Sequence, residues 1–193
     1  GHMIAADHWY RKPEEGTRVC GNLGHWIDLA VHLFYATESV LPHIKITIAY
    51  ADTQTFDDNL TVILTTERGD LVTLTLTARE EPFEGIHELI IFQQEHLFVK
   101  IDDFRRAVFY QGSKKHVKKY KPKDVGHEQA ILQPFAAHNK RNQDEVFLST
   151  ELMLHIMSMV KQKETSSLFY QGQCRETYEA NSARFNTRQH AES

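Results

Sequence analysis

The chain has 193 residues, of which 41% are hydrophobic and 25% charged, which suits one globular domain of generous size or a small domain with an appendage. Its formal net charge of -4 excludes a generally basic nucleic-acid-binding protein. No apolar run approaches the roughly 18 residues that a membrane span requires. Residues 1–3 resemble the remnant of a cleaved affinity tag, so we assign a single domain to residues 4–193. Cys20 and Cys174 lie far apart, which favours free thiols and predicts a cytoplasmic location.

The chain begins with a polar lead-in followed by one helix. Residues 4–17 are polar and include Pro13 and Gly16, which predicts a loop. Residues 23–35 are predicted to form a helix, because apolar residues recur there at helical spacing. These residues are Leu23, Ile27, Ala30 and Phe34.

From residue 43 the hydrophobic period changes to two, which predicts a run of strands. The expected strands are residues 43–50, 59–66, 71–79, 86–93, 97–101, 107–110 and 117–120. Short turns join neighbouring strands, which favours an antiparallel sheet. One face of this sheet is apolar and the other is rich in threonine. The threonine-rich face is either solvated or paired with a second copy of the chain, and the second option predicts a homo-oligomer.

After Gly126 the helical period returns. Ala130, Pro134 and Phe135 indicate one helix, and Ser149 is expected to cap a second that ends near Lys163. The inward residues of the second helix would be Leu152, Ile156, Met159 and Val160. The tail from residue 173 is expected to add a short helix. A helix, a run of strands and then helices predict an α+β fold, in which helices cover one face of an open, predominantly antiparallel sheet.

A row of titratable side chains lies on the first predicted helix. His25, Asp28 and His32 share one stripe, at i, i+3 and i+7. Two imidazoles and a carboxylate could share a metal ion, but positions i and i+7 lie about 10 Å apart along the axis. We therefore expect no metal site. His25 is then either a catalytic group or a structural side chain, and Asp28 is expected to fix the local geometry.

The segment leading into this helix resembles a known motif. Residues 17–29 read TRVCGNLGHWIDL, which is similar to the substrate-domain helix of the Gfo/Idh/MocA oxidoreductases, named after glucose-fructose oxidoreductase, inositol dehydrogenase and rhizopine catabolism. One branch of that family reads close to G-R-I-I-G-E-x-C-H-F-I-D-L. The matching positions are Arg18, Gly21, His25, Ile27, Asp28 and Leu29. FVKIDDF at 98–104 and GHE at 126–128 resemble later family segments, in the family's order.

This resemblance implies the C-terminal substrate-binding and dimerisation domain of an NAD(P)-dependent oxidoreductase, with a fold like the C-terminal domain of glyceraldehyde-3-phosphate dehydrogenase. The substrate would be a sugar, nucleotide sugar or polyol, oxidised by hydride transfer. NAD or NADP would bind an N-terminal Rossmann domain, for which this chain has no strand, G-x-G-x-x-G turn and helix, and no Glu-Lys-Pro motif. The chain alone is therefore expected to bind no cofactor and to be inactive.

The same resemblance suggests roles for individual residues. His25 would be the catalytic histidine, and Asn22 would hold a neighbouring substrate hydroxyl. Arg18 would pair with a substrate carboxylate or phosphate, or hold the lead-in loop through a salt bridge. Trp26 would line a sugar pocket or belong to the core. Gly21 and Asn22 stand where family members carry carboxylates, and asparagine can orient a hydroxyl but cannot take its proton.

Two other interpretations remain open. The chain could be a non-catalytic α+β binding or assembly module that keeps the fold without the chemistry, or a metal-dependent hydrolase using His25, Asp28 and His32. A basic run over residues 113–123 contains six lysines but only one aromatic residue, Tyr120. Nucleic-acid sites interleave aromatic residues with basic ones, so this run is better explained as a solvated hairpin edge that lysines protect against strand pairing.

Overall fold

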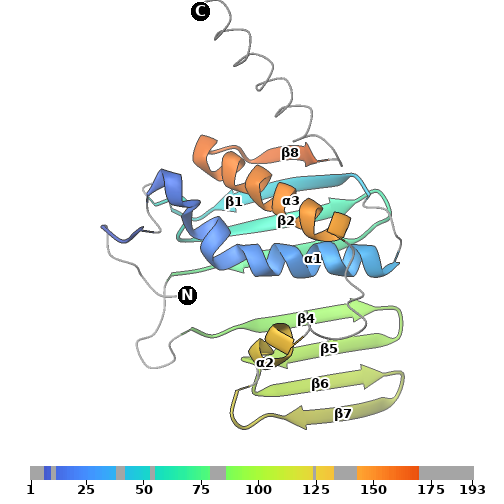
Figure 1. Cartoon of the computed structure of the whole chain (residues 1–193). Helices are drawn as coiled ribbons and strands as arrows, with labels where there is room; N and C mark the ends of the chain where they lie inside the picture. Colours follow the sequence, from blue (N-terminus) through green and yellow to red (C-terminus); the bar gives the residue numbers. More distant parts are fainter. Residues whose placement is uncertain are drawn as a thin grey trace, which may run out of the picture. The chain divides into compact units, whose positions relative to one another are not determined.

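The computed structural model describes residues 7–9, 12–37, 42–52, 55–78, 86–123, 125–132 and 143–169. These residues form two compact units (Figure 1). We call residues 7–78 with 143–169 the helical unit, and residues 86–132 the meander unit. The described strands form two four-stranded antiparallel sheets, one in each unit. The α+β class is therefore confirmed, whereas the single open sheet that the sequence suggested is wrong for these strands.

The helical unit combines two long helices with one sheet whose strand order is β3-β2-β1-β8. A 3-10 turn (Pro13–Glu15) and a π-helix (Val19–Leu23) precede the first long helix. The remaining elements are α1 (Gly24–Thr37), β1 (Ile44–Tyr50), β2 (Leu60–Thr66), β3 (Leu71–Leu76), α3 (Gln143–Gln162) and β8 (Ser166–Phe169).

The core of the helical unit lies between the sheet and both helices. Alternation along β1 buries Ile44, Ile46 and Ile48, and the last two lie opposite Leu64 and Val62 of β2 in the antiparallel register. Figure 1 shows α1 and α3 on the same face of this sheet. The apolar residues predicted to point inward are all buried: Leu23, Ile27, Ala30, Phe34, Leu152, Ile156, Met159 and Val160.

The opposite face of this sheet carries the expected threonines. Thr61 pairs with Thr75 and Ile63 with Thr73 across β2 and β3. The Thr61 and Thr75 hydroxyls lie 3.1 Å apart. These side chains are exposed or half-buried, so the alternation of apolar and threonine residues is confirmed.

The meander unit is a sheet whose strands follow chain order. Its elements are β4 (Leu89–Gln94), β5 (Leu97–Asp102), β6 (Arg106–Gln111), β7 (Lys114–Lys119) and α2 (His127–Leu132). Val99 and Ala107 are buried on one face. On the other, several apolar side chains remain exposed: Leu89 (55%), Ile91 (60%), Tyr110 (38%) and Val117 (44%).

Some element boundaries differ from the predictions. Ser149 does not cap α3, which begins six residues earlier at Gln143 and carries Asp144 and Glu145 in its first turn, where acidic residues favour a helix start. The Ser149 hydroxyl instead donates to the Val146 carbonyl at 2.9 Å. Strand β8 was not predicted, because four residues are too short for a clear alternation.

Two further expectations lie outside the described residues. The helix expected around Pro134 and Phe135 falls within 133–142, and the tail helix falls after 169. None of the helices in the described part of the chain has the length and apolar character needed to cross a membrane.

Candidate functional site

The backbone leading into α1 is irregular at the position that the sequence singled out. Gly16 and Thr17 both have positive φ, 85° and 61°. A β-branched residue such as Thr17 is disfavoured in the left-handed region, and such strain costs about 1–3 kcal/mol. The π-helix Val19–Leu23 follows at once. Strained residues and short π-helices both concentrate at functional sites in proteins.

A buried ion pair holds this irregular segment in place. Arg18 is only 2% exposed, and its Nη1 donates to Asp58 Oδ1 at 2.8 Å. The Arg18 backbone N–H donates to Asp57 Oδ2 at 3.2 Å, so both ends of the residue bind the loop between β1 and β2. Of the two roles expected for Arg18, this geometry matches the salt bridge that holds the lead-in segment.

Asn22 is tied to the same arginine. Its Oδ1 accepts a hydrogen bond from Arg18 Nε at 3.2 Å, and the residue is half-buried. Because the carbonyl oxygen is used, the amide nitrogen is the group with which Asn22 would donate to a ligand. Gly21 lies exposed within the π-helix. The structure therefore brings Arg18 and Asn22 together as one bonded group.

His25 lies exposed in the first turn of α1. Its ring centroid is 4.6 Å from that of Trp26, with the planes tilted by 52°. Trp26 is half-buried and packs against the core, so one ring of this pair is anchored and the other is accessible. A Cβ at Gly24 would come within 2.9 Å of Met153 Sδ, which shows how closely α3 approaches the start of α1. The pair thus stands on tightly packed backbone.

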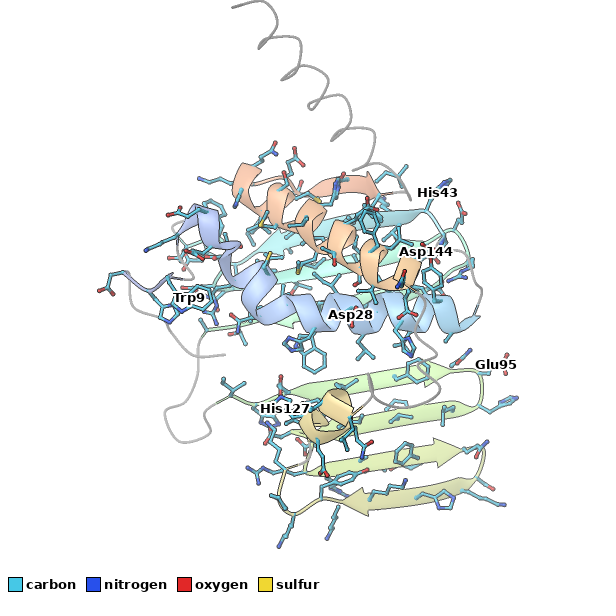
Figure 2. The ribbon with its side chains drawn as sticks, viewed as in Figure 1. Trp9, Asp28, His43, Glu95, His127 and Asp144 are labelled. Carbon is cyan, nitrogen blue, oxygen red and sulfur yellow. The ribbon has the colours of Figure 1, made fainter. Side chains whose placement is uncertain are left out.

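The remaining members of the polar row have different surroundings. Asp28, labelled in Figure 2, is half-buried. His32 Nδ1 lies 3.0 Å from Oε1 of Glu145, a buried residue of α3, so His32 joins the two helices. Within the described ranges, no three His, Cys, Asp or Glu side chains are grouped so that they could hold a metal ion. Both histidines of the row are therefore exposed, and His32 in addition pairs the two helices.

Cys20, the described cysteine, lies within the π-helix. Its Sγ is 3.5 Å from Met157 Sδ, and burial raises the pKa of the thiol, an effect that Lys161 partly offsets. A thiol with a raised pKa is protonated at neutral pH and is a poor nucleophile. Cys20 is therefore a packing residue, and Cys174 lies outside the described residues.

Sequence reasoning missed Asp57 and Asp58, which complete the support of the site. They stand in FDDNL, just before β2, where the pattern indicates only a turn. Their pairing with Arg18, 39 and 40 residues away, leaves no local signal. The available sign was that Arg18 stands directly before Val19 and Cys20 at the entry to an apolar helix, because a guanidinium that becomes buried requires a carboxylate partner.

Neither a scan against protein-family models nor a search of curated proteins gave a match. The resemblance of residues 17–29 to the Gfo/Idh/MocA motif therefore stays a prediction. The candidate functional site is the group formed by Arg18, Asp58, Asn22, His25 and Trp26.

Proposed function

We propose that this chain is the substrate-binding and dimerisation domain of an NAD(P)-dependent oxidoreductase that acts on a sugar, nucleotide sugar or polyol. The observation that carries the proposal is the placement of His25. It is an exposed imidazole in the first turn of α1, directly after a π-helix that the buried Arg18–Asp58 pair holds in place. Rigid support of an accessible acid/base group is what a catalytic histidine requires.

In this proposal His25 orients the substrate hydroxyl and accepts its proton as the carbon is oxidised. The Asn22 amide nitrogen donates to a neighbouring hydroxyl, and the Trp26 ring offers an apolar surface to the C–H face of a sugar. Arg18 and Asp58 position these groups and do not contact the substrate. The same proposal includes a fold like that of the C-terminal domain of glyceraldehyde-3-phosphate dehydrogenase.

The described residues do not fit a dinucleotide. Their strands pair only in antiparallel order, and no Gly-rich turn joins a strand to a helix as a pyrophosphate site requires. We therefore derive no step through NAD or NADP from these residues. In the proposal, the cofactor binds a Rossmann domain, and the threonine-rich face of β1, β2 and β3 contributes to a homo-oligomer.

The first test is ligand binding by the chain itself, followed through Trp26 fluorescence in a Trp9→Phe background. Glucose, myo-inositol and UDP-glucose are the probes. We expect saturable quenching by at least one of them, because Trp26 lies beside His25. His25→Ala should abolish the response. His43→Ala is the matched control, since His43 is an exposed histidine of the same unit, paired with Glu67.

The second test concerns catalysis. The reading frame upstream of the Ile4 codon should encode about 100–150 residues of a dinucleotide-binding domain. In that longer protein, His25→Ala should lower turnover by about 10²–10⁴-fold, the range for loss of an acid/base group. His43→Ala should retain turnover. Wild-type turnover in the His25 variant would reduce His25 to a structural residue. Failure of all three probes together with no such reading frame would favour the non-catalytic binding module.

A further inference from the structure

Strand β7 differs from every other described strand in its exposure. All six of its residues, Lys114 to Lys119, are exposed. It is the outermost strand of the order β4-β5-β6-β7 (Figure 1). Among the described residues it pairs only with β6, so its second edge offers backbone N–H and C=O groups to another strand.

The charges on this edge are not neutralised within the described part of the chain. None of the four lysines in β7 forms an ion pair there, and Arg106 of β6 stands directly opposite Lys119. Like charges at directly opposed positions destabilise a sheet.

Two other cations of the meander unit, Lys123 and Arg105, are neutralised by contrast. Lys123 Nζ lies 2.6 Å from Asp103 Oδ1, and Arg105 Nε lies 3.0 Å from Asp103 Oδ2. These hydrogen bonds, led by that of Lys123, hold the pKa of Asp103 below its ordinary value. Among the described residues of the meander unit, four of the lysines without an ion pair lie on β7, and Lys100 and Lys121 lie outside that strand.

We propose that the β7 edge binds an extended acidic polypeptide segment by strand addition. Alternation places Lys114 and Lys118 on one face of the strand and Lys115 and Lys119 on the other. A peptide strand with glutamate or aspartate at alternate positions would pair its main chain with β7 and its carboxylates with the lysines of one face. Main-chain pairing supplies affinity, and the alternating side chains supply specificity.

The same lysines select against other partners. An uncharged strand would have to approach a row of ammonium groups, which is how natural edge strands avoid unwanted pairing. A single-stranded nucleic acid would need exposed aromatic rings for stacking. Tyr110 is exposed, but lysine ammonium groups lie over the nearest rings: Lys115 Nζ is 5.4 Å from the Tyr110 ring centre and Lys118 Nζ is 5.8 Å from that of Phe109. An acidic strand is the partner whose charge and shape both match.

The test titrates the full chain with a peptide of alternating glutamate and threonine, followed by NMR. We expect shifts of the β7 amides and slower hydrogen exchange of those that face outward. A peptide of alternating glutamine and threonine lacks the charge and should not bind. A peptide of alternating glutamate and proline keeps the charge but has half of its N–H groups removed, and it should also fail to slow exchange.

Matched variants test whether binding depends on the lysines of the β7 edge or on positive surface charge in general. The double change Lys115→Gln with Lys119→Gln should weaken binding by about ten-fold, as loss of two partly solvated ion pairs predicts. Lys45→Gln, an exposed lysine on β1, should leave binding unchanged. Equal binding of the glutamate–proline peptide or of a thymidine oligonucleotide would overturn the proposal, because either would show attraction of any anion. So would unchanged exchange at β7 on addition of the glutamate–threonine peptide.

Discussion

The two units of this protein place their apolar residues differently. In the helical unit, α1 and α3 cover one sheet face and leave Ile27, Ile46 and Leu152 fully buried. In the meander unit, apolar residues such as Leu89 and Ile91 stay more than half exposed on one face. Charge also differs. Residues 86–132 contain nine lysines and arginines against six acidic residues, whereas the rest of the chain contains 13 against 20.

The packed core of one unit and the exposed sheet edge of the other could support different kinds of functional site. A packed core holds side chains in fixed rotamers, so it can support a strained segment such as the π-helix before His25. An exposed, charged sheet edge offers no such rigidity, but it presents backbone groups and lysines that a partner strand can meet. This contrast is why we propose a reacting group in the helical unit and a polypeptide-binding edge in the meander unit.

The largest expected effect comes from breaking the buried ion pair. Arg18→Met removes the guanidinium that binds the buried Asp58 carboxylate and should lower the free energy of unfolding by about 3–5 kcal/mol. Adding Asp58→Leu should restore most of the loss, because the pair is then replaced by apolar groups. Arg105→Met in the meander unit removes an exposed pair with Asp103 and should cost at most about 1 kcal/mol. Urea unfolding of the variants would measure each value, and equal losses for Arg18 and Arg105 would contradict the contrast.

The next largest effect is a difference in stability loss between two strand isoleucines, one in each unit. Ile46→Ala creates a cavity in the core of the helical unit and should cost about 2–5 kcal/mol. Ile91→Ala removes a side chain that is 60% exposed and should cost no more than about 1 kcal/mol, from strand preference. Thermal and urea unfolding followed by circular dichroism would test this. A loss at Ile91 as large as that at Ile46 would mean that the exposed face is covered in solution.

Sequence patterns predicted the helical unit better than its site. The period of two gave β1, β2 and β3, and the period of 3.6 gave the buried stripe of α1, because burial imposes both periods on the chain. The π-helix was not predicted, and the carboxylates that bind Arg18 at its start, those of Asp57 and Asp58, lie 39 and 40 residues away in the sequence. The division into two sheets was missed as well. Strands of both sheets have the same period, so alternation does not say which strands pair.

Sequence prediction has the same limit for the single residue His25. Its helical position and its neighbour Trp26 follow from the pattern, but exposure and support do not. Arg18 illustrates the reverse case, because the sequence allowed substrate contact and a salt bridge equally. Its 2% exposure and its contact with Asp58 distinguish between them.

A smaller effect is expected when a glycine of the irregular lead-in to α1 and a glycine of an ordinary turn are each replaced by alanine. Gly16→Ala and Gly112→Ala both place a Cβ at positive φ, 85° and 58°. Each should cost about 1 kcal/mol for the left-handed conformation. At Gly16 the new Cβ would also stand 3.0 Å from the Cβ and Sγ of Cys20, whereas at Gly112 nothing lies within 4 Å. We therefore expect Gly16→Ala to be the more destabilising of the two in urea unfolding. The reverse order would show that the contact with Cys20 is relieved.

The smallest expected effect is a pH dependence confined to the helical unit. Burial lowers the pKa of His155 from 6.5, an effect that Glu164 partly opposes. The unfolded chain therefore binds this proton more readily than the folded chain, so stability should fall as pH decreases below about 6.5 and level off below the lowered pKa. His155→Gln should remove this part of the slope in urea titrations at different pH values. Ser167→Ala removes only the 2.9 Å contact with His155 Nε2 and should keep the slope, because burial is its larger cause. Loss of the slope in the Ser167 variant would instead identify the hydrogen bond as the cause.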